Sequence, residues 1–296
     1  MGERLNGALE AAIERATGRP ARIACSAPVG GGCINDARRV ELSDGRVYFV
    51  KSNSDPLPGM FEREAEGLAA LAAVGAIRVP VPVCTGGGDG VTPFIVMEYI
   101  ETGAHGPCFF EDFGRRFAEL HKKSAGERFG FAHDNYLGNT PQENAWCDDW
   151  VEFWRERRFG FQLRLGRTRR QFDASLERLL VRLMDRLPEY IGQPDEPACL
   201  LHGDLWGGNY LSDSSGRPVL IDPAVYYGRR EADLAMTLLF GGFDRRFYAA
   251  YQEVWPLADG SEARLDIYKL YHLLNHLNIF GGSYRSGCMA ILSRYA

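Results

Sequence analysis

The stretch of sequence that decides the fold is Leu201-His202-Gly203-Asp204-Leu205-Trp206-Gly207-Gly208-Asn209, with Ile221-Asp222-Pro223 after it. It brings two carboxylates and one amide close to flexible glycines, and oxygen ligands of these kinds hold divalent cations. Each residue alone has a simpler alternative, because Asp204 can cap a turn and Asn209 can bond the loop backbone. Taken together, the set predicts the catalytic and metal-binding segment of a phosphotransferase.

Spacing within this segment matches that of kinase catalytic loops. Four residues separate Asp204 from Asn209, which is the interval in the H-R-D-L-x-x-x-N loop of protein kinases. Val219-Leu220-Ile221 is a short apolar strand that ends in Asp222, where those enzymes carry a second aspartate. Phosphoryl transfer needs a carboxylate that orients the acceptor hydroxyl, and oxygen ligands that hold Mg²⁺ against the phosphates. We therefore expect Asp204 to be the base, and Asn209 and Asp222 to bind the metal.

A lysine for the nucleotide phosphates is expected at position 51. Lys51 ends a predicted strand, and a strand, glycine loop, strand unit precedes it. Kinase-like folds place the phosphate-binding lysine at this point. The pattern favours Gly31, Gly32 and Cys33 as a loop that covers the phosphates, although a glycine run alone also fits an ordinary turn. The loop departs from the GxGxxG pattern of protein kinases, and GxxxxGK[ST] occurs nowhere in the chain.

An acidic partner for this lysine is expected on the helix predicted over residues 61–74. The apolar residues of that segment recur at helical spacing, and Glu64 shares their face, whereas Glu66 points nearly the opposite way. An inward-facing acid beside the strand of Lys51 predicts an ion pair that orients the lysine. The simpler alternative is that Glu64 is a solvated residue at the edge of the helix face.

The fold class predicted from these patterns is α+β, with a protein-kinase-like arrangement of two lobes. Strand signals fill the first part of the chain and predict five antiparallel strands with one packed helix. The last of them, residues 93–100, runs out into a linker whose backbone is expected to pair with an adenine edge. Beyond it strand signals become rare and helical ones dominate. We therefore expect a nucleotide-binding lobe at 1–98 and a helical lobe with the acceptor site at 99–296.

Composition and charge exclude several function classes. The chain has 296 residues, 45% hydrophobic and 25% charged, and its net charge of −5 gives no basic field for nucleic acid or an anionic membrane. We expect the arginine-rich run 155–170 to be a solvated helix face. Seven scattered cysteines without a CxxC pair favour a reducing compartment. No signal peptide or membrane span is predicted, so the chain is expected to be cytoplasmic.

The catalytic segment resembles the H-G-D-L-W-x-G-N box of the fructosamine-3-kinase and ketosamine-3-kinase family, a branch of the aminoglycoside phosphotransferase-like kinases. Trp206 within the box sets this family apart from general aminoglycoside or choline kinases. Further similar stretches begin at Gly31-Gly32-Cys33-Ile34-Asn35, Met60-Phe61-Glu62, Thr140-Pro141-Gln142, Tyr226-Tyr227-Gly228 and Tyr271-His272-Leu273. The resemblance spans about residues 20 to 285. One departure is Gly207, where serine is frequent in the family.

The resemblance implies a function and assigns roles to residues. It implies ATP-dependent phosphorylation of the O3 hydroxyl of a ketosamine, on a small amine or a protein lysine, followed by spontaneous loss of the sugar. By this resemblance Asp204 is the base, Asn209 and Asp222 bind Mg²⁺, and Lys51 with Glu64 serves the phosphates. The nucleotide hinge falls on Met97, Glu98 and Tyr99. His202 and Trp206 are expected to bind the substrate.

Alternatives within and beyond this class stay open at this point. One is a small-molecule kinase of the aminoglycoside, choline or homoserine kinase type, and another is a nucleotide-binding module without catalysis. We also hypothesise that oxidation of Cys33 blocks nucleotide binding, the alternative being an inert small residue. Nothing in the sequence decides between a monomer and a homodimer.

Overall fold

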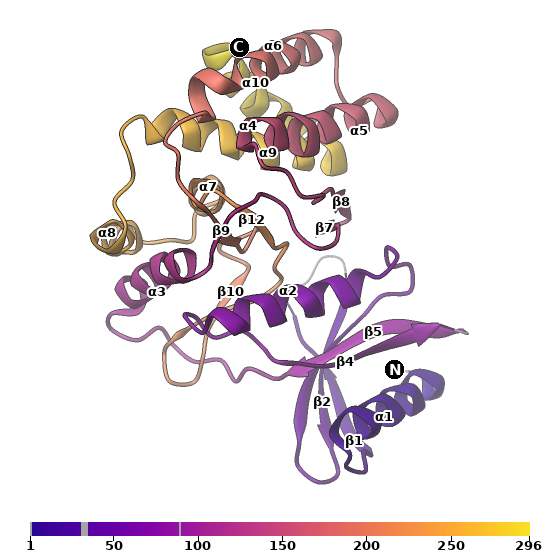
Figure 1. Ribbon diagram of the computed structural model, residues 1–296. Coiled ribbons are helices and arrows are strands. Elements are labelled where there is room, and N and C mark those ends of the chain that lie inside the picture. Colours follow the sequence, from indigo (N-terminus) through magenta and orange to yellow (C-terminus); the bar gives the residue numbers. More distant parts are fainter. Residues whose placement is uncertain (1, 31–34, 89) are drawn as a thin grey trace.

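A computed structural model describes residues 2–30, 35–88 and 90–296. The first part of the chain forms an antiparallel sheet with the strand order β1-β2-β3-β5-β4. Its elements are α1 (Glu3–Thr17), β1 (Ile23–Pro28), β2 (Asp36–Leu42), β3 (Val47–Ser52), α2 (Met60–Val74), β4 (Pro82–Gly88) and β5 (Val91–Glu98). In Figure 1 this sheet lies at the bottom of the molecule, and α2 lies between it and the remaining elements.

Strand β5 shows why the sheet needs a helix on each face. Its residues 93–97 are apolar without interruption, which is typical of a strand that is buried on both sides. Phe94 and Val96 belong to a core that includes Leu9 of α1, whereas Ile95 and Met97 belong to a core that α2 shares with the second lobe. Helix α1 thus adds a second packed helix to the arrangement predicted from the sequence.

The remaining elements are mainly helical, and in Figure 1 most of them lie above α2, while α3 lies to its left. They are α3 (Phe109–Lys123), β6 (Ala125–Gly126), β7 (Asn135–Leu137), β8 (Thr140–Gln142), α4 (Trp150–Phe153), the π-helix η1 (Trp154–Gly160), α5 (Phe161–Arg169), α6 (Ala174–Ile191), β9 (Ala198–Leu201), β10 (Tyr210–Ser212), β11 (Pro218–Leu220), β12 (Tyr226–Gly228), α7 (Glu231–Leu239), α8 (Arg245–Val254), α9 (Ser261–Phe280), η2 (Gly282–Tyr284) and α10 (Arg285–Tyr295).

Four short strands frame the segment that carries the expected catalytic residues. Strand β9 leads into the loop 202–209, which we call the catalytic loop, and β10 and β11 then form an antiparallel hairpin. Strand β12 returns antiparallel to β9, with Tyr226 opposite Leu201. Because β9 and β12 pair, the residues just after β9 lie beside the residues just before β12. This pairing places the catalytic loop next to the segment 222–225.

Glycine residues let β4 approach β5 closely. Gly86 pairs with Phe94, and Gly87 lies in the register shift between Gly86 and Gly88. An added Cβ would lie 2.5 Å from the Phe94 ring at Gly86 and 2.4 Å from Pro93 at Gly87. Glycine therefore serves a close approach of β4 to β5 rather than a turn.

The prediction that the arginine-rich run is a solvated helix face is wrong for Arg158. Its side chain has no exposed surface. The guanidinium carbon lies 4.4 Å from the centre of the Phe153 ring and 4.2 Å from that of Tyr226, and Nη2 donates to Asn144 Oδ1 at 2.9 Å. Aromatic faces and amide oxygens compensate a buried guanidinium, so Arg158 belongs to the core of the helical lobe.

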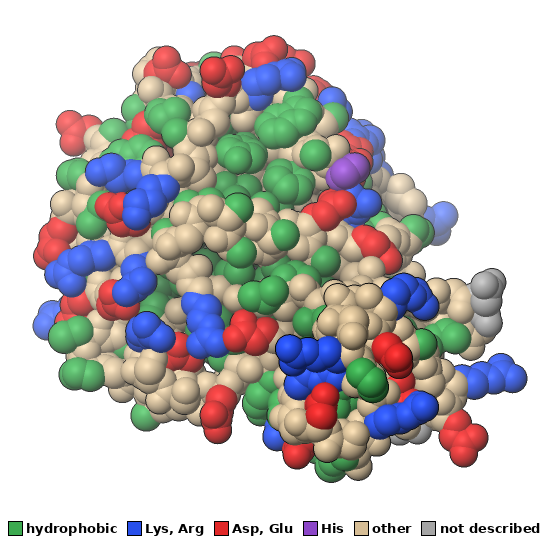
Figure 2. Space-filling model, turned by 60° about the horizontal axis from the view of Figure 1, so that its bottom comes forward, with side chains coloured by type: hydrophobic (Ala, Val, Ile, Leu, Met, Phe, Trp, Pro, Cys, Tyr) green, Lys and Arg blue, Asp and Glu red, His purple; other side chains and the backbone are tan. Residues whose placement is uncertain are grey.

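Positive and negative side chains are interspersed over the face that Figure 2 shows, in keeping with the modest net charge of the chain. Among the described residues, no helix is long and apolar enough to cross a membrane.

Candidate active site

Lys51, near the end of β3, lies at the junction of the two lobes. Its Nζ donates to Glu64 Oε1 of α2 at 2.7 Å and to Oδ1 of Asp222. The lysine side chain is 9% exposed and that of Glu64 11%, so the pair is largely removed from water. Burial opposes the charge on Lys51, but the Asp222 and Glu64 carboxylates outweigh it and raise the pKa of the lysine. Lys51 is therefore a fixed positive charge that joins α2 to the segment after β11.

The expected partner helix has the orientation that its periodicity predicted. Phe61, Leu68 and Leu71 are buried in the shared core, and Glu64 leans from that face toward β3. Glu66 lies near the surface and pairs with Arg63 at 2.7 Å. A change of two positions on a helix turns a side chain through more than half a revolution, which separates the two acids.

His202 occupies a place that differs from its predicted role. The sequence reasoning expected it to bind substrate, but its side chain has no exposed surface. The ring nitrogen Nδ1 accepts a hydrogen bond from the Asp204 backbone N–H at 3.2 Å. The other ring nitrogen, Nε2, donates to the Ile221 carbonyl oxygen at 2.9 Å. Burial lowers the pKa of His202, which fits a neutral ring. The prediction of substrate contact is wrong in this structure, because the ring instead braces the two segments that carry Asp204 and Asp222.

A buried carboxylate lies beneath the catalytic loop, and its role as an anchor was not predicted from the sequence. Asp233 of α7 is 1% exposed and accepts from the backbone N–H groups of His202 at 2.7 Å and Gly203 at 2.8 Å. Its Oδ2 also lies 3.2 Å from Nε2 of His121. Burial opposes its charge, but these donors prevail and lower the pKa of Asp233. Asp233 thus holds the start of the loop as a charged acceptor.

Two backbone conformations bring the catalytic loop against the segment before β12. Gly203 has φ of +83°, and an added Cβ would lie 1.9 Å from the Ala224 carbonyl oxygen. Asp222 has φ of +55°, which is uncommon for a residue other than glycine. Residues held in such regions concentrate at functional sites, where the surrounding structure compensates the strain. Gly203 adopts its positive φ without strain, so the uncommon conformation is that of Asp222.

Asp204 and Asn209 contact one another across the catalytic loop. The Asn209 amide nitrogen donates to the Asp204 backbone carbonyl at 2.8 Å and to its carboxylate Oδ2 at 3.1 Å. Burial, followed by the nearby Asp222 charge, raises the pKa of Asp204 well above its usual value, while the bond from Asn209 lowers it. Asp204 is only partly covered, so a hydroxyl from outside can reach it.

The oxygen donors here fit a magnesium ion. Both hydrogen bonds of Asn209 use Nδ2, which leaves the amide oxygen for a cation. The Asp222 side chain is 43% exposed, and only its Oδ1 is engaged by Lys51. Mg²⁺ is commonly bound through one or two protein oxygens together with water and phosphate oxygens. The oxygen atoms of Asn209 and Asp222 therefore fit the Mg²⁺ ion expected from the sequence.

The expected nucleotide hinge lies where β5 leaves the sheet. Met97 is buried in the shared core, and the Glu98 backbone N–H donates to the Val81 carbonyl at 2.8 Å. The Tyr99 ring lies 5.4 Å from the guanidinium carbon of Arg39. The predicted phosphate loop, Gly31, Gly32 and Cys33, falls outside the described residues, as does the proposed oxidation site at Cys33.

Trp206 lies at the surface of the catalytic loop, with 40% of its side chain exposed. Its indole covers Gly208, where an added Cβ would lie 2.4 Å from the ring. The Phe240 ring lies edge-on to it, with 6.3 Å between ring centres, and the His276 ring is 4.8 Å from that of Phe240. The sequence did not place Phe240 or His276 near Trp206, because both are distant from the loop along the chain. Together, Trp206, Phe240 and His276 form an aromatic row that starts beside Asp204.

Relatives with assigned names match most of this chain. It is 44% identical over 283 residues to a protein-ribulosamine 3-kinase of Oryza sativa subsp. japonica, named as chloroplastic, covering 94% of this chain and 80% of the relative. It is 41% identical over 283 residues to a probable ketoamine kinase of Synechocystis, covering 95% and 94%. These similarities confirm the prediction of an enzyme of the ketosamine kinase type.

The solved structures and the family comparison agree with the relatives. A crystal structure of a putative fructosamine-3-kinase from Thermobifida fusca superposes with a TM-score of 0.85 at 36% identity, covering 96% of this chain and 97% of that one. The kinase-like fold expected from the sequence is thereby confirmed. A sequence model described as fructosamine kinase matches residues 6–296. This chain belongs to the fructosamine kinase family.

Proposed function

We propose that this protein transfers the γ-phosphoryl group of ATP to the O3 hydroxyl of a ketosamine. The observation that carries the proposal is a continuous set of contacts across the two lobes. Glu64 holds Lys51, Lys51 holds Asp222, and His202 braces the segments of Asp222 and Asp204. Asn209 completes the set through its bond to Asp204. The proposed base, the two proposed metal ligands and the proposed phosphate-binding lysine are connected by these contacts, which supports phosphoryl transfer.

In this reaction Asp204 orients the acceptor. Its carboxylate accepts the O3 hydroxyl proton as the bond from O3 to the γ-phosphorus forms. The bond from that phosphorus to the bridging oxygen of ADP breaks in the same displacement, and ADP leaves with the electron pair. Burial of Asp204 and the nearby Asp222 charge favour proton acceptance, because both raise the pKa of Asp204.

The nucleotide is proposed to lie where the lobes meet. Lys51 would contact its phosphates, while the backbone of Met97, Glu98 and Tyr99 would pair with the adenine edge. Asn209 and Asp222 would hold Mg²⁺, which supplies charge neutralisation on the phosphates when bound. Gly31, Gly32 and Cys33 remain the proposed cover for the phosphates. Glu64 keeps Lys51 in place and need not contact the nucleotide.

The acceptor is proposed to rest on Trp206. An aromatic face packs well against the C–H groups of a sugar, and this one lies beside the base. The row continues through Phe240 to His276, which extends the apolar surface away from Asp204. We assign the sugar to Trp206 and the amine-bearing portion to the row beyond it. The amine can belong to a small molecule or to a protein lysine.

Phosphorylation at O3 places a leaving group next to the ketosamine carbonyl. Loss of phosphate then releases the sugar as a deoxyosone and returns the free amine, so the proposed outcome is deglycation.

We also propose a cytoplasmic location. The described cysteines are free, and two of them, Cys25 and Cys108, are exposed, which suits a reducing compartment.

The test is a panel of acceptors incubated with Mg·ATP, with mass detection of the phosphorylated product. Ribulosamine and fructosamine adducts of a lysine derivative should gain one phosphoryl group. Kanamycin, choline and homoserine serve as acceptors of other kinases that share the fold class. Turnover of any of these three without turnover of the ketosamines would overturn the proposal, as would ATP hydrolysis with no phosphorylated acceptor.

A further inference from the structure

Arg78 lies between α2 and β4 and is fixed by its backbone to the second lobe. Its carbonyl oxygen accepts from the Leu220 N–H at 2.9 Å, and it forms an isolated parallel bridge with Val219. Both partners belong to β11, the strand that leads to Asp222. The first lobe thus contributes a short extension to the hairpin of β10 and β11.

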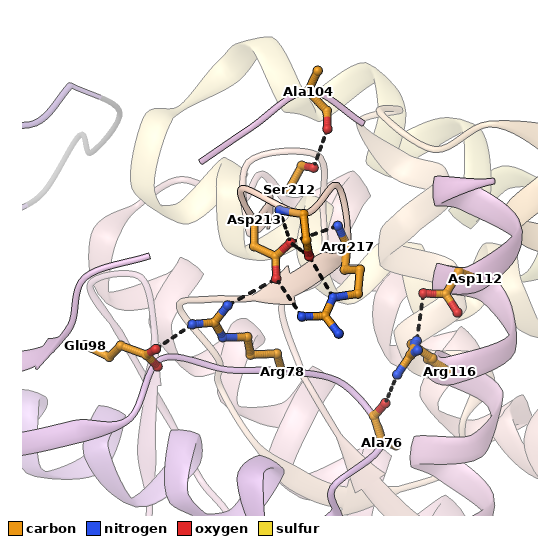
Figure 3. A network of polar contacts seen from close by, with 10 residues as sticks. Ala76, Arg78, Glu98, Ala104, Asp112, Arg116, Ser212, Asp213 and Arg217 are labelled. Carbon is orange, nitrogen blue, oxygen red and sulfur yellow. Dashed lines mark hydrogen bonds and ion pairs between the residues drawn. The ribbon is translucent and has the colours of Figure 1, made fainter. Parts of the chain in front are cut away.

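The side chain of Arg78 joins two carboxylates from different parts of the chain. Nη2 donates to Glu98 Oε1 at 2.5 Å, and Nη1 donates to Asp213 Oδ2 at 3.1 Å. Figure 3 shows the guanidinium between the two acids, with one nitrogen directed at each. Glu98 is the last residue of β5, and Asp213 begins the turn between β10 and β11. Arg78 therefore ties the proposed hinge to the tip of the hairpin.

Asp213 is a rigid anchor for this tie. Its Oδ1 accepts from the Ser215 N–H at 2.9 Å, the Ser215 hydroxyl at 2.5 Å and the Arg217 N–H at 3.0 Å. Its side chain is 3% exposed, and the Ser215 hydroxyl bond, with the other donors, lowers the pKa of Asp213. Because one oxygen is saturated by the turn, the other is held in place for Arg78.

The chain that follows the hinge returns to the same turn. Gly103 N–H donates to the Ser212 carbonyl at 3.0 Å, and Gly106 N–H donates to that of Gly216 at 3.2 Å. The Ser212 hydroxyl also donates to the Ala104 carbonyl at 3.1 Å, as Figure 3 shows. The turn between β10 and β11 therefore holds the hinge in two ways. Arg78 connects it to Glu98 within the hinge, and residues 102–106, which follow the hinge, bond to it directly.

The opposite end of this hairpin carries the proposed metal ligands. Asn209 directly precedes β10, Asp222 follows β11 by two residues, and the Ile221 N–H donates to the Asn209 carbonyl at 3.1 Å. The three paired positions of the hairpin span about 10 Å between its two ends. A single small element thus separates the proposed adenine-binding backbone from the proposed phosphate and metal site.

We propose that Arg78 is a positioning residue that sets the register between the adenine and phosphate subsites of the nucleotide site. The inference rests on the proposed function. Adenine and triphosphate belong to one molecule, so their subsites must keep a fixed separation for both halves to bind at full strength. Loss of the tie would release the start of the hinge while the hairpin keeps its metal ligands. The contact is partly exposed and adds little to folding stability, so its effect falls on nucleotide binding.

Calorimetric titration with three probes tests the proposal: Mg·ADP, adenosine alone and Mg·tripolyphosphate alone. Arg78→Gln removes the contacts of Arg78 with both Glu98 and Asp213, and Glu98→Ala removes only the contact at the hinge. Either variant alone can test the proposal if the other does not fold. Arg217→Gln is the matched control, because Arg217 contacts the same Asp213 oxygen at 3.7 Å from the exposed side of the turn. Arg116→Gln is a second control, which removes a contact to the Ala76 carbonyl away from the hinge.

We expect the Kd of Mg·ADP to rise about three- to tenfold in Arg78→Gln and in Glu98→Ala, with little further change in the double variant. The Kd values of adenosine and of Mg·tripolyphosphate should each change less than about twofold. Both controls should match the wild type with all three probes. In steady-state kinetics the KM for ATP should rise while kcat stays nearly constant.

Two results would overturn the positioning role. One is an unchanged Mg·ADP affinity in both tie variants, and the other is an equal loss for the separate probes, which would show general loosening of the site. The titrations contain no acceptor, so they are independent of which hydroxyl is phosphorylated. Failure of the wild type to bind Mg·ADP would overturn the proposed kinase function as well.

Discussion

Asp233→Asn should destabilise the protein and misplace the catalytic loop. The carboxylate accepts from two backbone N–H groups and from His121, and an amide in its place has one oxygen and one donor group. At least one of the three donors must then face an N–H group. Hydrogen bonds to a buried charge each contribute about 1.5–3 kcal/mol, and an unsatisfied buried donor adds a desolvation cost. We expect the free energy of unfolding to fall by about 3 kcal/mol.

Urea denaturation and steady-state kinetics measure the two consequences. Displacement of the loop by about 1 Å should lower kcat by roughly 10²-fold, because Asp204 directly follows the anchored residues. Asp244→Asn is the matched control: Asp244 caps α8 by accepting from the Arg246 N–H, and asparagine caps helices equally well. A loss below about 1 kcal/mol in Asp233→Asn, or an equal loss in Asp244→Asn, would refute the assignment of Asp233 as the anchor.

Other predictions concern the lysine, the loop glycine and a buried histidine. Lys51→Met should lower kcat/KM for ATP by about 10²- to 10³-fold, and a loss below tenfold in steady-state assays would contradict its role. Gly203→Ala should lower unfolding free energy by at least about 2 kcal/mol more than Gly45→Ala, because only at Gly203 does the added Cβ meet the Ala224 carbonyl, while both have positive φ. Burial lowers the pKa of His272 to about 3, so its stabilising effect is full above the unfolded-state pKa and is lost as the pH falls. Between pH 7.5 and 5.5 the wild type should lose about 1 kcal/mol more than His272→Asn in urea titrations, and parallel losses would argue against a neutral buried ring.

The residues that sequence reasoning located are those whose signals are local. Asp204 and Asn209 lie within one loop, and the helical phase of α2 directed Glu64 toward the core without knowledge of the fold. Lys51 followed from its place at the end of a strand. The structure brings these residues together with Asp222. The predicted fold class was confirmed because strand and helix patterns separate clearly along the chain.

The features that sequence reasoning missed depend on contacts between distant segments. Asp233 differs from other helical acids only through the loop that packs on it, and no periodicity marks that contact. Arg158 was placed at the surface because arginine is mostly exposed, yet rings from two other elements enclose it. His202 was expected to meet substrate because of its neighbours in sequence, but the pairing of β9 with β12 turns it inward.

The role of Asp204 as the base is tested by comparing Asp204→Asn with the wild type, using a ribulosamine adduct and Mg·ATP. Product is followed by mass detection, and Mg·ADP binding is measured by calorimetry. We expect kcat to fall by at least about 10²-fold, the lower end for loss of a general base, while Mg·ADP affinity changes little. Retention of most activity in Asp204→Asn, with the acceptor still phosphorylated at O3, would contradict the assignment of Asp204 as the base.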